Sequence, residues 1–343
     1  MLKNYLIIAY RNIVRHKSHT LINVLGLALG ITCSLLIFLL VNFHLSTDTY
    51  HTHASQIYRI VTEMHFPEGT GYTPGVPIPL GEAIKTDFPQ IEKSAMVLGN
   101  YGFLLTIQNP EKGAEDRFLE NQGIVLVEPS FFDIFDYQWL AGNPKTALTE
   151  PNSVVITEKW AKKFFGDRNP IGQVMRADNK HTFKVTGLLK DYPTHTDLKY
   201  DMFVSYNTHK AVNPEYYMGN WAWINSASTC FIRLSEDFTA RQLTAAMPAF
   251  HKKYYTQKDN VHHHVLQPLS DVHFNQQYYG SMQKERLYAM ALIGIVILVI
   301  ACINFINLST AQAARRAKEV GVRKVLGSTQ RQLFWQFIKK QHC

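Results

Sequence analysis

The chain has 343 residues, of which 46% are hydrophobic, and a formal net charge of +8. The positive charge lies at the two ends: residues 1–20 carry +4 and residues 309–343 carry +7, which leaves −3 for the rest. The basic residues therefore flank apolar segments, a pattern that argues against a nucleic-acid-binding surface. Two uncharged stretches, 21–43 and 287–308, exclude a chain that is soluble throughout.

The first apolar stretch follows a short basic segment. Residues 2–16 place apolar side chains on one helical face, so we expect residues 1–20 to form an amphipathic helix at the cytoplasmic membrane surface. Residues 21–43 predict the first transmembrane helix. A cleaved signal peptide is the alternative, but its apolar core is usually about 7–15 residues long, shorter than this run.

Glycine spacing within this span favours close helix packing. Gly26 and Gly30 form a Gly-x-x-x-Gly pair, which lets another helix approach because neither residue has a side chain. Glycine is also common in membrane helices without any such role, and both interpretations remain open.

Residues 44–286 predict an α+β domain of about 240 residues, large enough to build a core without disulfide bonds. Of the four cysteines in the chain, only Cys230 lies in this region. Short apolar runs separated by Gly, Pro, Asn and Asp predict strands and helices in alternation, and the domain is expected to have one or two lobes. Strands are predicted at 56–65, 91–98, 117–127, 153–156 and 183–189, and helices at 79–88, 157–165 and 239–254.

The second span, 287–308, leads into a basic cytoplasmic segment, 309–343. Asn304 and Asn307 are polar amides that seek interhelical partners in lipid. The helix is expected to continue to about residue 326 and to end at Gly327. Thr329 and Gln332 then have the spacing of a capping box that begins a second helix, giving a cytoplasmic helix-turn-helix.

The positive-inside rule places both termini in the cytoplasm and residues 44–286 outside it. The predicted fold class is therefore a membrane protein in which two transmembrane helices flank an α+β extracytoplasmic domain. A DNA-binding role for the C-terminal helix-turn-helix is disfavoured, because its first helix continues out of the bilayer.

The sequence contains none of the motifs that would indicate an enzyme. It has no Walker A loop, no Gly-x-Ser-x-Gly, no His-Glu-x-x-His and no Cys-x-x-Cys. His262, His263 and His264 are interpreted as a solvated or strand-borne run rather than metal ligands. Asp133 and Asp136 are interpreted as caps and surface positions of a Phe-rich segment. We predict no catalytic, cofactor or metal site, and the same scepticism applies to His51 and His53 beside Asp48.

Several segments resemble MacB/FtsX-type ABC transporter permeases. The C-terminal segment ARRAKEVGVRKVLGSTQRQLFWQF resembles their cytoplasmic stalk extension and coupling helix, and NFINL precedes it as in that family. PSFFDIFDYQWLAGNP, NSVVITEKWAKKFFGDRNPIGQ and FKVTGLLKDYPTHTDLKYD resemble the MacB-like periplasmic core domain. NYLIIAYRNIVRHKSHTLINVLGLALGI resembles the family's amphipathic start and first span.

The resemblance implies an inner-membrane permease that works with a separate or fused ABC-type ATPase and a second permease protomer or half. The ATPase binds the nucleotide, and the permease passes the motion to its periplasmic domain to export or extract a peptide, lipoprotein or hydrophobic compound. The residues expected to face the ATPase are Arg315, Arg316, Glu319, Arg323, Lys324, Gly327, Thr329, Gln332 and Phe334. Their basic members have positive-inside anchoring to anionic lipid as a second possible role.

Such permeases have at least four spans per unit, so this sequence, with two, is expected to be a fragment or a truncated product. The alternative function is a two-span receptor with an extracytoplasmic sensor domain, which shares the same outline. That alternative predicts a signalling segment after the second span, and none is present before Cys343. An extracytoplasmic enzyme is a third and weaker possibility.

Overall fold

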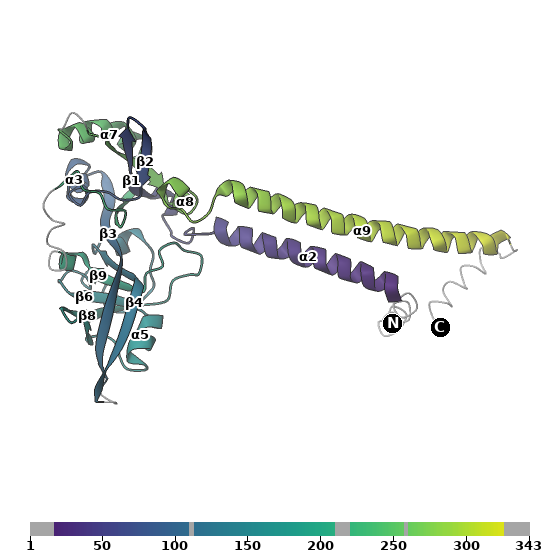
Figure 1. Cartoon of the computed structure of the whole chain (residues 1–343), viewed down its shortest axis with the longest axis horizontal. Coiled ribbons are helices and arrows are strands. Elements are labelled where there is room, and N and C mark those ends of the chain that lie inside the picture. The colour runs from purple at the N-terminus through teal and green to yellow at the C-terminus, as the bar shows by residue number, and fades with distance from the viewer. Residues whose placement is uncertain (1–16, 110–112, 210–219, 257–259, 326–343) are drawn as a thin grey trace. The chain divides into compact units, whose positions relative to one another are not determined.

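In a computed structural model of the chain, the described residues are 17–109, 113–209, 220–256 and 260–325. They fall into two compact units, one from the two ends of the chain and one from His44–Gln283. Figure 1 labels the elements along the chain. The predicted fold class is confirmed in its main part, since two apolar helices flank an α+β domain in the sequence order expected. The predicted amphipathic helix and the turn and second helix after residue 326 lie outside the described residues.

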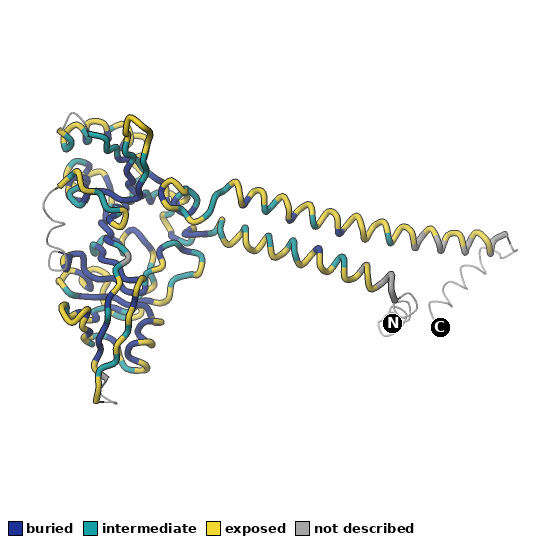
Figure 2. Tube along the Cα trace, viewed as in Figure 1, coloured by how far each residue is buried: buried dark blue, intermediate teal, exposed yellow. Residues whose placement is uncertain are grey.

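Two long helices make up the first unit. α2 (Lys17–Leu45) and α9 (Lys284–Val325) each contain a stretch long and apolar enough to cross a membrane, Val24–Leu45 and Lys284–Ala311. Most of their large apolar side chains are exposed, as Figure 2 shows; Leu29, for example, is 66% exposed. A helix satisfies its own backbone hydrogen bonds, so apolar helices with exposed side chains suit a lipid environment.

Small residues let α2 and α9 approach each other closely. A Cβ atom built on Gly30 would lie 2.5 Å from the Cβ of Ala301, and one on Gly26 would lie 3.4 Å from the side-chain nitrogen of Asn304. A Cβ atom built on Gly294 of α9 would lie 3.1 Å from Cγ2 of Ile37 on α2. Removing side chains at these positions permits backbone contact, which drives helix association where no hydrophobic effect is available.

One mixed sheet organises the second unit. In the part of the chain that the structure describes, the strands run in the order β11-β1-β10-β3-β4-β9-β6-β8-β5, with β2 beside β1 and β7 between β3 and β8. Most pairs are antiparallel, and β4–β9 and β6–β8 are parallel. The strands are β1 (Ile57–Phe66), β2 (Gly69–Thr73), β3 (Ile91–Asn109), β4 (Ala114–Val127), β5 (Trp139–Ala141), β6 (Ser153–Thr157), β7 (Val174–Ala177), β8 (His181–Leu189), β9 (Met202–Ser205), β10 (Ser228–Leu234) and β11 (His262–Pro268).

The pairing closes part of this sheet into a ring. β7 pairs with both β3 and β8, so the path β3-β4-β9-β6-β8-β7 returns to its start. Closure removes free strand edges and encloses buried side chains such as Leu105, Phe183 and Met175. The other end of the sheet stays open and finishes at β11.

Helices cover the two faces of the sheet and bury separate apolar clusters. One cluster includes side chains from α3 (Leu80–Asp87), α5 (Glu158–Phe165) and α7 (Ala240–Tyr254). The other includes side chains from the short α4 (Phe131–Ile134) and α8 (Leu269–Val272). Three 3₁₀ turns, η1 (Ala54–Gln56), η2 (Tyr206–Thr208) and η4 (Gln276–Tyr278), complete the described elements.

The strands and helices predicted from local patterns are present within a few residues, except that β3 runs on to Asn109. The helix predicted at 239–254 begins with a capping box in which Thr239 and Gln242 each accept from the other's backbone. Asp133, as expected, is a surface position, paired with Lys93 at 2.8 Å, beside the buried Phe131 and Phe135. The sequence patterns predicted no strand for β2, β5, β7, β9 or β10, and for β11 a strand was only one of two interpretations of the histidine run.

We predict that Gly30→Ala separates α2 from α9, because its methyl group would overlap that of Ala301. The cost of such overpacking is about 1–3 kcal/mol, measured as a loss of unfolding free energy in detergent. The double variant Gly30→Ala with Ala301→Gly should recover most of it. Gly321→Ala is the matched control, since nothing lies within 4 Å of that position. Equal losses of unfolding free energy at positions 30 and 321 would contradict close packing of α2 against α9 at Gly30.

Candidate functional site

The best-connected polar group in the domain lies where the chain leaves α2. We call His44, Asp48, Thr196, Asp197 and His273 the junction network. Its members come from three segments: the turn after α2, the loop between β8 and β9, and the end of α8. Asp48 and His273 are 3% and 7% exposed, so their polar atoms depend on one another rather than on water.

Asp48 binds the loop between β8 and β9 through three hydrogen bonds. Its backbone N–H donates to the carbonyl of His195 at 3.1 Å. Its carboxylate accepts from the Thr196 hydroxyl and from the Asp197 N–H, the latter at 3.2 Å. The Asp48 backbone has φ 56°, a left-handed conformation that Asp tolerates better than most residues. Burial raises the pKa of the Asp48 carboxyl, and the two hydrogen bonds to the carboxylate oppose that rise.

A histidine pair connects the same loop to the end of α8. His273 Nδ1 lies 2.9 Å from a carboxylate oxygen of Asp197, and its Nε2 lies 2.9 Å from His44 Nδ1. With both rings neutral, His44 donates to His273 and His273 donates to Asp197. The rings of His44 and His273 also stack, with centroids 5.2 Å apart. The last residues of α2 are thus joined by hydrogen bonds to the segment that leads into α9.

The segment after α8 is held in turn by a buried arginine on β1. Arg59 donates through Nε and Nη2 to Gln267 Oε1, at 3.0 and 2.7 Å, and through Nη2 to the carbonyl of Tyr278 at 3.0 Å. The Met282 N–H donates to the carbonyl of His273 at 3.0 Å, two residues before α9 begins. The last segment of the domain is therefore held to β1 and β11 by side chains.

Aromatic rings surround the first turn of the domain. Tyr50 packs on His51 with ring centroids 4.1 Å apart, and His51 Nδ1 accepts from the Asp136 N–H at 3.1 Å. Because Nδ1 is an acceptor, the proton of the neutral ring is on Nε2, which is buried and has no hydrogen-bond partner within the described structure. Burial lowers the pKa of His51 to about 4, although the charge of Asp136 opposes this. Asp136 and His51 therefore form a structural contact.

The junction network carries no arrangement suited to covalent chemistry. It holds no serine or cysteine nucleophile, and the described residues contain no group of three or more His, Cys, Asp or Glu side chains placed to hold a metal ion. Its hydrogen bonds join segments that are far apart in the sequence, as His44 and His273 illustrate. Within the domain, the network therefore holds the turn at Asp48, the loop at 195–197 and the residue after α8 together.

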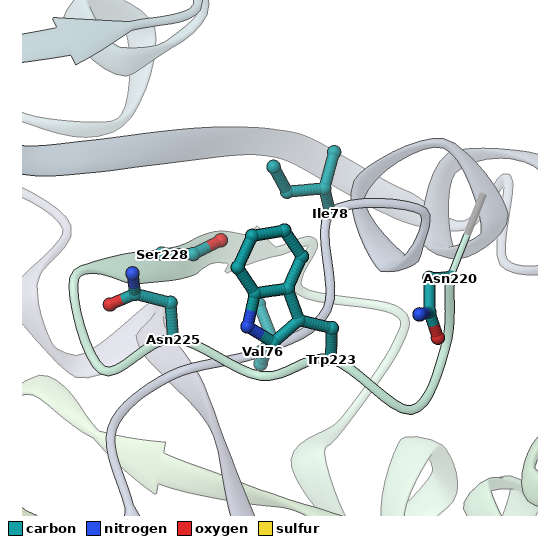
Figure 3. A pocket seen from close by; sticks show the side chains of 6 residues that line it. All are labelled: Val76, Ile78, Asn220, Trp223, Asn225 and Ser228. Carbon is teal, nitrogen blue, oxygen red and sulfur yellow. The ribbon is translucent and has the colours of Figure 1, made fainter. Parts of the chain in front are cut away.

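A shallow hollow elsewhere in the domain has a different character. Figure 3 shows the indole of Trp223 beside Val76 and Ile78, with the amides of Asn220 and Asn225 near it. Trp223 is 47% exposed. The hollow is too small to enclose a drug-sized ligand, which requires a deeper and larger cavity.

The residues expected to face an ATPase fall partly outside the described structure. Arg315, Arg316, Glu319, Arg323 and Lys324 lie on the backbone of α9, which continues unbroken to Val325. Their side chains, and Gly327, Thr329, Gln332 and Phe334 altogether, lie outside the described residues. Of the residues predicted for helix packing, Gly26, Gly30 and Asn304 lie between α2 and α9, and Asn307 is exposed.

Sequence reasoning missed the junction network. Its residues are dispersed over about 230 positions and match no motif, so only the sheet topology brings them together. The sequence contained a weak indication of a polar group here, because Asp48 lies a few residues after the first apolar span. The histidines at 262–264 are borne on strand β11, as interpreted from the sequence, and His264 is 1% exposed.

Comparison with known proteins covers both units. The family model described as the MacB-like periplasmic core domain matches residues 20–250, and the one described as the FtsX-like permease C-terminal region matches residues 291–341. Among curated proteins, none matches the sequence.

Three solved structures are similar to the domain. One is a domain of a permease protein from Porphyromonas gingivalis, with 19% identity, coverage of 64% of this chain and 92% of that chain, and a TM-score of 0.49. The periplasmic region of MacB from Actinobacillus actinomycetemcomitans has 14% identity, coverage of 64% and 91%, and a TM-score of 0.43. The extracellular domain of the noncanonic ABC-type transporter YknZ from Gram-positive bacteria has 14% identity, coverage of 61% and 99%, and a TM-score of 0.38.

We predict that Asp48→Asn loosens the loop at 195–197. Asparagine keeps the left-handed backbone and the side-chain volume but loses one acceptor, so a buried donor is left without a partner, at a cost of about 1–3 kcal/mol. The measurement is hydrogen–deuterium exchange of the loop together with unfolding in detergent. Asp178→Asn is the matched control, with φ 51° at an exposed site where one carboxylate oxygen accepts from Leu104. Unchanged exchange at 195–197 would contradict the role given to Asp48.

Proposed function

The chain belongs to the family of ABC transporter permeases with a MacB-like periplasmic core domain, and we propose that it couples ATP hydrolysis by a partner ATPase to movement of that domain. The observation that carries the proposal is the match of two family models, one over residues 20–250 and one over residues 291–341, the second of which includes most of helix α9. The substrate class that fits this mode of action is a peptide, a lipoprotein or a hydrophobic compound handled outside the cytoplasm.

The proposed topology has both termini in the cytoplasm and the domain outside the inner membrane. The charge distribution supports it, since the basic residues lie beyond the spans at the chain ends and residues 44–286 carry little net charge. In this topology residues 1–20 lie at the inner surface, 21–43 and 287–308 span the bilayer, and 309–343 form the stalk extension and coupling helix.

The proposed transmission element is α9. A helix of 42 residues is about 63 Å long at a rise of about 1.5 Å per residue, enough to pass from the cytoplasmic surface through the hydrocarbon core. No proline interrupts it, so a displacement at its C-terminal end is carried along its length. At Lys284 the chain passes directly into the segment held by His273 and Arg59.

The proposed ATPase-facing surface lies on the last turns of α9 and just beyond. Arg315, Glu319 and Arg323 recur every four residues and so share one side of the helix. An ATPase docking there would bring the nucleotide, so this chain needs no cofactor of its own and no nucleic-acid partner. The remaining exposed sides of α2 and α9 are available to lipid and to a second permease protomer or half.

The FtsX-like match over residues 291–341 favours the permease over the two-span receptor. A receptor would begin its signalling segment in this region, where the sequence instead follows the permease pattern.

We predict that the double charge reversal Arg323→Glu with Lys324→Glu abolishes coupling to the ATPase that co-purifies with the wild-type protein from native membranes. Reversing two interface charges should reduce co-purification and stimulated hydrolysis by about tenfold or more. Lys180→Glu, an exposed charge in the domain, is the control and should have no effect. Repeating the assay in nanodiscs of neutral and anionic lipid separates docking from lipid anchoring. If the charge-reversed variant stimulated ATP hydrolysis as well as the wild type in both lipids, the proposed docking surface would be refuted.

We also predict opposite accessibility for two engineered cysteines. In spheroplasts, a membrane-impermeant maleimide should label Lys162→Cys on α5 without permeabilisation. It should label Lys318→Cys on α9 only after detergent is added, and the wild-type chain gives the background. Labelling of position 162 only after permeabilisation would refute the topology.

A further inference from the structure

Strand β11 is an open edge of the sheet, and its outward-facing backbone groups are capped by side chains. The pairing of His65 with Val261 and of Thr62 with His264 sets the register, so the N–H groups of His262 and His264 point away from β1. His262 N–H donates to Asn260 Oδ1 at 3.1 Å. His264 N–H donates to Nε2 of His251 at 2.8 Å, and His251 lies in the last turn of α7.

The contact made by His251 requires a neutral imidazole ring. His251 Nε2 is an acceptor, so its proton is on Nδ1. His264 Nε2 accepts from the Tyr255 hydroxyl at 2.9 Å, and its Nδ1–H donates to Thr62 Oγ1 at 3.0 Å. The Thr62 hydroxyl donates onward to the carbonyl of Gly75 at 2.6 Å. A proton added to Nε2 of His251 would meet a backbone donor, whereas the Tyr255 hydroxyl can turn to accept from a protonated His264.

The surroundings of His251 oppose a positive charge. His263 lies on β11 with its ring centroid 5.7 Å away, and His65 on β1 stacks on His263 at 4.3 Å. A carboxylate oxygen of Glu63 on β1 lies 2.9 Å from Nε2 of His65. The other charged or titratable groups are Lys252, Lys253, Tyr254 and Tyr255 on α7, His262 and His264 on β11, and Asp87 on α3, which pairs with Lys253.

The protonation equilibria agree with this geometry. Burial, helped by repulsion from His263, lowers the pKa of His251 to about 4. Burial likewise lowers the pKa of His264. A histidine whose pKa is lowered in the docked state stabilises that state fully above its ordinary pKa of about 6.5, and the stabilisation is lost as the pH falls from there towards 4.

We propose that the C-terminal half of α7 is an acid-released latch on the β11 edge. When His251 takes up a proton, its Nε2 becomes a donor, the His264 N–H loses its acceptor, and the helix end detaches from the strand. Detachment uncovers the edge of β11 and the apolar face of α7 that carries Met247 and Phe250, both 3% exposed in the docked state. This latch is independent of ATPase docking.

The test is hydrogen–deuterium exchange of the full chain in nanodiscs between pH 7.5 and pH 5, corrected for the intrinsic exchange rate. Protection of residues 247–256 and of the His264 amide should fall by up to about tenfold per pH unit below 6.5 for one proton taken up. Helix α5, Glu158–Phe165, should keep its protection over the same range. Unchanged protection of α7, or equal loss in α5, which indicates global unfolding, would overturn the latch.

Variants identify the histidine responsible. His251→Gln offers a neutral acceptor at the position of Nε2, so it should keep α7 protected at pH 5. His251→Arg offers only donors and should lower protection already at pH 7.5. His53→Gln, at an exposed site, is the control and should leave the pH profile unchanged. A His251→Gln profile identical to that of the wild type would overturn the assignment, and the wild-type pH series decides the proposal if the variants do not fold.

Trp221 supplies a second readout. Its ring stacks on that of Tyr254, with ring centroids 4.4 Å apart. The centroid of the Phe250 ring lies 6.0 Å from that of Trp221. Release of the helix end should change the emission of this tryptophan over the same pH range, and the change should vanish in Trp221→Phe. A pH-dependent change that persists in Trp221→Phe would assign the signal elsewhere and count against the latch.

Discussion

The carboxylate of Asp48 holds the first turn of the domain against the loop between β8 and β9. A chain that leaves an apolar helix must satisfy the free carbonyl groups of the last turn and then turn into a folded domain within a few residues. Here the turn is completed by a residue with φ 56° whose side chain accepts from Thr196 and Asp197. The same loop receives the His273 ring, so the three segments of the junction network share one set of hydrogen bonds. Because Asp48, Thr196 and His273 are buried, removing a partner of any of them leaves a polar group unsatisfied.

The sheet of the domain is closed into a ring of strands at one end and ends in the open strand β11 at the other. The ring formed by β3, β4, β9, β6, β8 and β7 has no free edges, and its interior is filled with apolar side chains. The open end is protected instead by side chains: Arg59 fixes the segment after α8, and His251 caps β11. Caps of this kind depend on the protonation and position of single groups, whereas ring closure depends on many backbone hydrogen bonds. Local opening is therefore concentrated at the β11 end.

Local sequence patterns determined much of this architecture, and long-range pairing determined the rest. The uncharged runs predicted both apolar helices, and the local pattern predicted α7 to begin within a residue of its start, where the structure shows a capping box at Thr239. The short strands β5, β7 and β9 have no periodicity long enough to detect, and they exist because neighbouring strands supply their hydrogen bonds. The junction network was missed for the same reason, since nothing in the sequence near Asp48 specifies Thr196 or His273 as its neighbours. The family resemblance, carried by the segments around residues 130–200 and 304–337, predicted the class of protein that physical patterns alone left open between a permease and a receptor.

The histidine pair His44 and His273 differs from His251 in the hydrogen-bond partners that the ring nitrogens meet. In the junction network, His44 and His273 face each other nitrogen to nitrogen, with Asp197 behind His273. With both rings neutral, the hydrogen on His44 Nδ1 already lies between the rings. At the β11 edge, His251 faces a backbone N–H that can only donate, and a proton there breaks the contact. The contact of His251 with the strand edge therefore depends on the imidazole ring staying neutral.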